Sequence, residues 1–128
     1  MIEFVMDDRH TSELSGFEFE GIKSNWKSEM HTRIINNADK PLEVWSFVDY
    51  KQTQTNKLLA ENIYIELFVD GKLKNGKDTF KVWKRLGIPF TIQPKQIVAV
   101  DMKFTTEEIK ETVAGRVGSF DFEFGIQE

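Results

Sequence analysis

Alternation of apolar and polar residues is the feature that most restricts what this chain can fold into. From Phe120 to Ile126 every second residue is phenylalanine or isoleucine, and Asp121, Glu123 and Gly125 lie between them. Successive side chains of a strand point to opposite faces, so this pattern gives one apolar and one largely polar face. The same spacing recurs at 97–104, 62–69 and 42–48. The pattern predicts a β protein.

Shorter or less regular strands are predicted at 2–6, 17–23, 29–36, 79–83 and 89–93. Turn-forming pairs such as Asp70-Gly71 and Asn75-Gly76 separate some of these segments. Short turns between consecutive strands favour antiparallel pairing. About nine strands without alternating helices predict an all-β, antiparallel two-sheet sandwich of about 7–9 strands, with a closed barrel as the alternative.

One segment has helical rather than strand periodicity. Thr105 is a suitable N-cap with Glu108 three residues later, and Ile109 and Val113 follow at i and i+4, before Gly115. This is the pattern of a capping box with a glycine stop. It predicts one short helix near residues 106–114, across an end of the sheets. The segment 51–57 is predicted to be a polar loop.

Length and composition restrict the class of protein. The 128 residues are enough for one domain, and no repeat or flexible linker divides the range 1–128. Cysteine is absent, which excludes disulfides, thiolate metal sites and a cysteine nucleophile. No apolar run reaches the roughly 18 residues of a membrane span. The acidic N-terminal segment does not look like a secretory signal, so we expect a cytoplasmic protein if the chain is complete.

Two stretches carry a family resemblance. Residues 33–42 (RIINNADKPL) resemble the strand, Asn-x-x-Asp-Lys-Pro, strand step of small bacterial immunoglobulin-like sandwich domains. Residues 92–95 (IQPK) before the strand at 98–104 resemble their hydrophobic-x-Pro-Gly step, with Lys95 in the place of glycine. The resemblance implies an immunoglobulin-like β-sandwich of bacterial or phage origin, used in adhesion, scaffolding or ligand holding. It transfers no functional residues.

The segment from Gly71 to Asp78 matches the phosphate-binding pattern G-x-x-x-x-G-K-[ST] at every position except the last. Asp78 replaces the hydroxyl that ligates magnesium and adds negative charge beside the phosphates. A phosphate loop also needs a helix next, whereas residues 79–83 have strand composition. We therefore interpret the segment as turns in a lysine-rich hairpin.

Other catalytic patterns are incomplete. Ser24 and Lys27 match S-x-x-K, but the companion motifs of serine acyl enzymes are missing. His10 and His31 have no metal-ligand spacing, and neither a metal nor a cofactor is predicted. Carboxylate pairs such as Glu107-Glu108 are common in the chain, but a hydrolase needs two that face one cleft. The chain is predicted not to be an enzyme.

Charge is unevenly distributed along the chain. The whole sequence has a net charge of −4, and its first thirty residues contain seven acidic and three basic residues. Between Gly71 and Arg85 there are six basic residues and one acidic residue. We call these six the basic ribbon: Lys72, Lys74, Lys77, Lys81, Lys84 and Arg85. The ribbon could keep an edge soluble, bind an acidic protein surface, or bind phosphates with its interleaved aromatics.

Trp26 lies in a polar context, Ser24-Asn25-Trp26-Lys27, and is predicted to be an exposed loop aromatic that anchors a ligand or partner. Together with the basic ribbon it forms the predicted binding surface. The function predicted is a non-catalytic protein-binding or assembly module, whose partner is another protein or a second copy. The acidic composition disfavours nucleic acid. The alternatives are a small-molecule or carbohydrate-binding sandwich and a carboxylate-based hydrolase.

Overall fold

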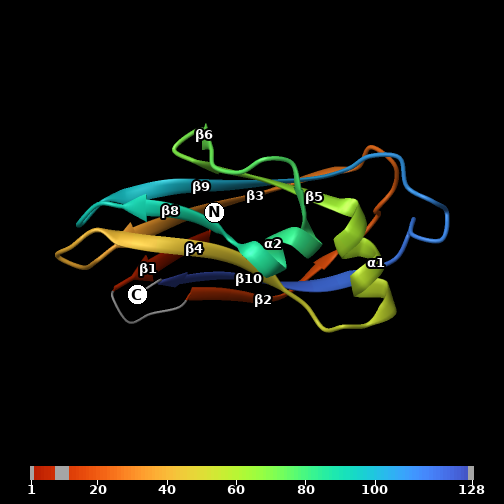
Figure 1. The fold of residues 1–128 in the computed structure, drawn as a ribbon, viewed down its shortest axis with the longest axis horizontal. Helices are drawn as coiled ribbons and strands as arrows, with labels where there is room; N and C mark the ends of the chain where they lie inside the picture. Colours follow the sequence, from red (N-terminus) through yellow and green to blue (C-terminus); the bar gives the residue numbers. More distant parts are fainter. Residues whose placement is uncertain (1, 8–11, 127–128) are drawn as a thin grey trace.

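The computed structural model describes residues 2–7 and 12–126 (Figure 1). Its strands are β1 (Ile2–Met6), β2 (Ser12–Phe19), β3 (Lys27–Asn36), β4 (Leu42–Asp49), β5 (Ile63–Val69), β6 (Lys72–Leu73), β7 (Asp78–Thr79), β8 (Ile88–Ile92), β9 (Ile97–Thr106) and β10 (Gly118–Ile126). Its helices are α1 (Gln54–Asn62) and α2 (Phe80–Leu86). Most of the strands occupy the segments where apolar residues alternate.

The strands form two sheets that face each other. Sheet A has six strands in the order β1-β3-β9-β5-β6, with β7 also paired to β5. Sheet B has four strands in the order β2-β10-β4-β8. The predicted two-sheet sandwich is therefore confirmed for the part of the chain that the structure describes.

The expectation of purely antiparallel pairing is wrong at one place. β1 pairs with β3 in parallel, with Ile2 opposite Thr32 and Met6 opposite Asn36. Parallel neighbours need a connection that crosses over, and here β2, in sheet B, lies between them in the chain. A short-turn argument misses this pairing because it takes consecutive strands as neighbours in one sheet.

Aromatic rings fill the space between the sheets. Phe19 is the centre of the cluster, with ring centroids 5.1 Å from Phe104 of sheet A and 5.6 Å from Phe120 of sheet B. Phe122, next along the inner face of β10, stacks on Phe104 at 5.5 Å. Fully burying a side chain of this kind contributes about 1.5–3 kcal/mol, so the cluster holds the two sheets together.

The strand predicted at 79–83 is instead the start of α2. Thr79 caps the helix by accepting a hydrogen bond from the Val82 N–H, and Gly87 ends it with a φ of 70°. Phe80 and Trp83 are both fully buried and lie three residues apart, on one face of the helix. Aromatic residues favour strands in general, but here helical spacing lets both rings enter the core.

α1 also lies where sequence analysis predicted a loop. Thr53 is its N-cap, and its side chain accepts a hydrogen bond from the Asn56 N–H at 3.2 Å. Leu59 and Ala60 are completely buried. The polar residues before them give the segment the composition of a loop. It nevertheless forms a helix that covers the end of the sandwich beside α2 (Figure 1).

The helix predicted near 106–114 is not formed. β9 continues to Thr106, which pairs with Ile63 of β5. Beyond it, the carbonyl of Glu107 accepts a hydrogen bond from Asn25 at 3.0 Å, and the N–H of Ile109 donates to Ser24 Oγ at 2.9 Å. These bonds to a distant loop use groups that a helix would need, so tertiary structure overrides the local capping signal.

Gly118 is the point where β10 passes under α1. A Cβ at this position would lie 2.6 Å from Leu59 Cδ1 and 3.0 Å from Asn56 Oδ1. We expect Gly118→Ala to lower the free energy of unfolding by about 1–3 kcal/mol, because α1 must move away from the sheet. Urea unfolding measures this. Gly76→Ala is the matched control, since no atom lies within 4 Å of its added Cβ; equal losses would contradict the tight contact.

Candidate functional site

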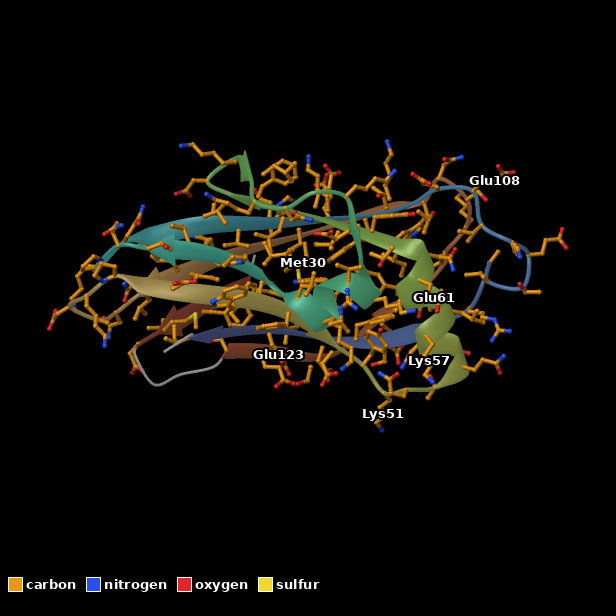
Figure 2. All side chains as sticks on the ribbon, in the orientation of Figure 1. Met30, Lys51, Lys57, Glu61, Glu108 and Glu123 are labelled. Carbon is orange, nitrogen blue, oxygen red and sulfur yellow. The ribbon has the colours of Figure 1, made fainter. Side chains whose placement is uncertain are left out.

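A cleft of about 580 Å³ opens between α1, α2 and the segment that joins β4 to α1. It is lined by Tyr50, Gln52, Lys57, Glu61, Lys81, Lys84 and Arg85. Figure 2 labels Lys57 and Glu61, which project from α1. We call this feature the basic cleft, because four of its lining residues are cationic.

The helices position these side chains through their buried faces. Phe80 and Trp83 fix α2 in the core, and the Trp83 indole N–H donates to the Ser46 carbonyl at 2.9 Å. Lys81 and Arg85, four residues apart on α2, therefore lie on a face directed to the cleft. The same logic holds on α1, where Asn56, Leu59 and Ala60 are buried and Lys57 and Glu61 line the cleft.

Two of the four cations already have acidic partners. Lys84 forms an ion pair with Asp49 at the end of β4, and this hydrogen bond holds the pKa of Asp49 below its ordinary value. The Lys84 ammonium also lies 5.3 Å from the centre of the Tyr50 ring. Lys81 Nζ lies 3.7 Å from Glu61 Oε1. These contacts orient the lysines along the cleft.

Lys57 and Arg85 form no ion pair with any residue that the structure describes. They line the same cleft as the paired lysines, and both are exposed. Among the described residues, the cleft thus has two positive charges without an ion-pair partner, in a lining that also contains Tyr50. Such an arrangement can bind a carboxylate or phosphate, and a guanidinium can bind either one through two parallel hydrogen bonds.

The structure places five residues of the basic ribbon in two separate parts. Lys81, Lys84 and Arg85 line the basic cleft. Lys72 lies in β6 and Lys74 follows it, and Figure 1 shows β6 at the top of the view, apart from both helices. The ribbon is therefore a sequence neighbourhood and not one continuous surface.

Lys77 belongs to neither part. It forms an ion pair with Glu107, which raises the pKa of the Lys77 ammonium, and it lies 4.8 Å from the centre of the Tyr64 ring. It lines a smaller hollow of about 350 Å³ that also contains Glu66 and Leu73. Its charge is already compensated within the chain.

Trp26 is partly buried, which corrects the expectation of an exposed anchor. Its ring meets Phe19 edge to face at 5.5 Å, and its backbone N–H donates to Thr106 Oγ1 at 3.0 Å. The polar neighbours of Trp26 suggested a solvent-facing loop. The loop instead folds back onto the aromatic core, and Trp26 covers one end of it.

The outward face of sheet B carries an acidic surface beside the basic cleft. Glu123 of β10 lies opposite Glu13 of β2, and Asp121 of β10 lies opposite Asp49 of β4. We call these four residues the acidic face. Burial, followed by the charge of Glu13, raises the pKa of Glu123. Figure 2 shows Glu123 on this sheet.

The phosphate-loop pattern has a structural role. β6 and β7 both pair with β5, and between them the Asn75 side chain accepts from the Leu67 N–H and donates to the Ile65 carbonyl, each at 2.8 Å. Asn75 thereby takes the place of a neighbouring strand along the edge of β5. A helix does follow, contrary to the sequence prediction, but Asp78 remains paired with Ile65 and binds Asn75.

The other candidate residues also make structural contacts. His31 uses both ring nitrogens, with Asp101 Oδ1 at 2.6 Å and Glu29 Oε2 at 3.2 Å. Residues 2–7 and 12–126 contain no group of three metal-ligating side chains placed to hold an ion. His10 lies outside the described residues. Ser24 holds the loop at Ile109 through its hydroxyl.

Sequence analysis missed the part of the cleft that lies outside the ribbon, namely Lys57, Glu61, Tyr50 and Gln52. The sequence signal that could have predicted this helix is Thr53, a suitable N-cap, followed five residues later by the apolar run Leu58-Leu59-Ala60. A helix there places Lys57 and Glu61 on one face at i and i+4.

No known protein family matches the sequence, and no curated protein matches it. Among solved structures, the chain is similar to PliG from Aeromonas hydrophila, a periplasmic inhibitor of g-type lysozyme, with 10% identity, 98% of each chain covered and a TM-score of 0.43. PliG from Salmonella Typhimurium gives 9% identity, 99% and 100% coverage, and 0.40. The CUB1-EGF-CUB2 segment of rat MASP-1 gives 8%, 98% and 43%, and 0.42.

At TM-scores below 0.5, these likenesses carry no argument about the fold or the function of this chain. The immunoglobulin-like resemblance is not confirmed, since no protein family matches the sequence. Neither α1 nor α2, the helices of the described residues, has the length and apolar character needed to cross a membrane.

Glu123 makes the free energy of unfolding depend on pH, and the sign of this dependence follows from the raised pKa of its carboxyl group. The folded state binds this proton more tightly than the unfolded chain, so wild-type stability falls as pH rises above the ordinary value of 4.5 and through the raised pKa. Glu123→Gln should therefore be more stable than wild type at neutral pH and equally stable well below pH 4.5. Unfolding of dilute protein across pH checks this; a difference that persists unchanged in acid would contradict it.

Proposed function

We propose that this domain is a non-catalytic binding module that uses the basic cleft to bind an acidic surface of a protein partner. The observation that carries the proposal is the pair of uncompensated cations, Lys57 and Arg85, in a cleft whose other two cations are held by Glu61 and Asp49. An acidic side chain entering the cleft completes this charge pattern.

The ion pairs of Lys81 and Lys84 orient these side chains before a ligand binds. Lys84 is held between Asp49 and the Tyr50 ring, so it loses little further freedom when a ligand binds. Arg85 is exposed at the end of α2, where its guanidinium can reach a carboxylate through two hydrogen bonds. Exposed charges of this kind mainly determine the rate of association and the orientation of the bound partner. This suits a partner that binds reversibly.

A protein partner fits better than nucleic acid. The acidic face adjoins the cleft, since Asp49 belongs to the first and binds Lys84 of the second. A nucleic acid backbone carries a charge at every phosphate and would run across these carboxylates. The net charge of −4 also disfavours binding of nucleic acid.

A small anionic ligand is the second candidate, because the volume of the cleft is within the range of small-molecule sites. A carboxylate-pair hydrolase has less support. The basic cleft contains Glu61 as its one acidic lining residue, and the smaller hollow contains Glu66. Neither of these two clefts brings together the carboxylate pair that glycoside hydrolysis requires.

The proposal is tested with a deca-glutamate peptide titrated into the protein and followed by isothermal calorimetry. We expect saturable binding that weakens as salt is raised, and about a tenfold loss of affinity in the double variant Lys57→Glu, Arg85→Glu. The matched control is Lys72→Glu, Lys74→Glu, which makes the same charge change outside the cleft.

Equal losses in the two double variants would show that overall charge, and not the cleft, attracts the peptide. A short single-stranded DNA is the second probe. If it binds more tightly than the peptide and depends on the same cleft residues, the assignment of a protein partner is wrong.

A further inference from the structure

We propose that the acidic partner is a second copy of this chain, and that two copies form a closed dimer around a two-fold axis. In this dimer the basic cleft of each copy meets the acidic face of the other. The inference rests on the proposed function, because it names the partner of the same cleft. It adds the acidic face, Glu13, Asp49, Asp121 and Glu123, as the other half of the interface.

The two surfaces share a border. Asp49 ends β4 in the acidic face, and it binds Lys84 of the basic cleft. Lys84 also lies close enough to Glu123 to act on the pKa of that carboxyl. In Figure 2, Glu123 lies below the centre of the molecule, and Lys57 and Glu61 lie to its right.

Adjacent patches of opposite sign suit a two-fold axis. When the axis passes between them, rotation places the acidic face of one copy over the basic cleft of the other, and each contact is made twice. Patches on opposite sides of the molecule would instead stack copies head to tail into open chains. The shared border therefore favours a dimer that closes.

Among residues 2–7 and 12–126, each surface has charge that no ion pair balances. Glu13 and Glu123 lie directly opposite each other on neighbouring antiparallel strands, an arrangement in which like charges repel. Lys57 and Arg85 have no acidic partner among the residues that the structure describes. A cation from a second copy placed between Glu13 and Glu123 relieves the repulsion and gives the cation its partner.

Sedimentation velocity over a range of protein concentrations tests the assembly directly. We expect a monomer–dimer equilibrium in low salt that shifts to monomer in high salt, because exposed ion pairs are screened. A monomer at every concentration in low salt would overturn the inference. Species that keep growing with concentration would overturn the two-fold arrangement.

Charge exchange identifies the contacting surfaces. The double variant Lys57→Glu, Arg85→Glu and the double variant Glu13→Lys, Glu123→Lys should each lose self-association by about tenfold or more. Mixed together, they should form a heterodimer as stable as the wild-type dimer. One of its two contacts keeps the wild-type charges, and the other carries the same pair with signs exchanged. Failure of the mixture to associate would contradict the pairing.

Two further proteins keep this test decisive. Lys72→Glu, Lys74→Glu reverses the same number of positive charges away from both surfaces and should dimerise normally. Glu13→Gln, Glu123→Gln removes two of the four acidic charges without adding long cations to a partly buried position, in case the lysine variant does not fold. On its own it should stay monomeric. Dimerisation by this variant would exclude the acidic face.

The two proposals fail in different ways. If wild-type protein binds deca-glutamate through Lys57 and Arg85 but remains monomeric, the dimer is wrong and the binding function stands. If reversing these two residues leaves both peptide binding and self-association unchanged, the basic cleft is not the binding surface, and both proposals fall together.

Discussion

The packing of Phe80 and Trp83 into the aromatic core is the interaction on which the rest of the structure depends. Phe80 lies 5.2 Å from Phe120, and Trp83 lies 5.6 Å from Phe122, so α2 is attached to the inner face of β10. These contacts convert a segment of strand-like composition into a helix. Once the helix is fixed, its remaining faces present Lys81, Lys84 and Arg85 to the cleft.

Core and surface are therefore linked through one short element. In α2, Phe80 and Trp83 fill the sandwich, and the three cations Lys81, Lys84 and Arg85 build a charged surface. The Trp83 indole bonds to the β4 backbone, and three residues further along β4, Asp49 pairs with Lys84. The same two elements thus determine where the basic cleft ends and where the acidic face begins. A binding surface of mixed sign follows from how this core is covered.

Local alternation predicts the strands well because it is a property of neighbouring residues. Phe120, Phe122 and Phe124 alternate with polar residues, and all three are buried. The helices depend on distant contacts. The apparent capping box at Thr105 is outcompeted by pairing with β5 and by bonds to the loop at Ser24, whereas α2 needs the core to accept its two aromatic rings.

The candidate site is predictable to the extent that its residues are near one another in sequence. The basic ribbon contains Lys81, Lys84 and Arg85, but it also contains Lys72 and Lys74, which the hairpin carries elsewhere. Lys57 comes from a different helix, and only the packing of α1 beside α2 brings it into the cleft. The neighbours of Trp26 indicate exposure, but its contact with Phe19 is a tertiary one.

The central claim is that an acidic group binds in the cleft between the two helices. It is tested most directly by titrating deca-glutamate into isotope-labelled Glu13→Gln, Glu123→Gln protein, in which a second copy does not compete, and by following the backbone amide NMR signals. The account predicts saturable shifts at residues 50–61 and 80–86, around the cleft lining. Shifts centred on residues 72–77, or weak shifts spread over every lysine-bearing segment, would contradict it.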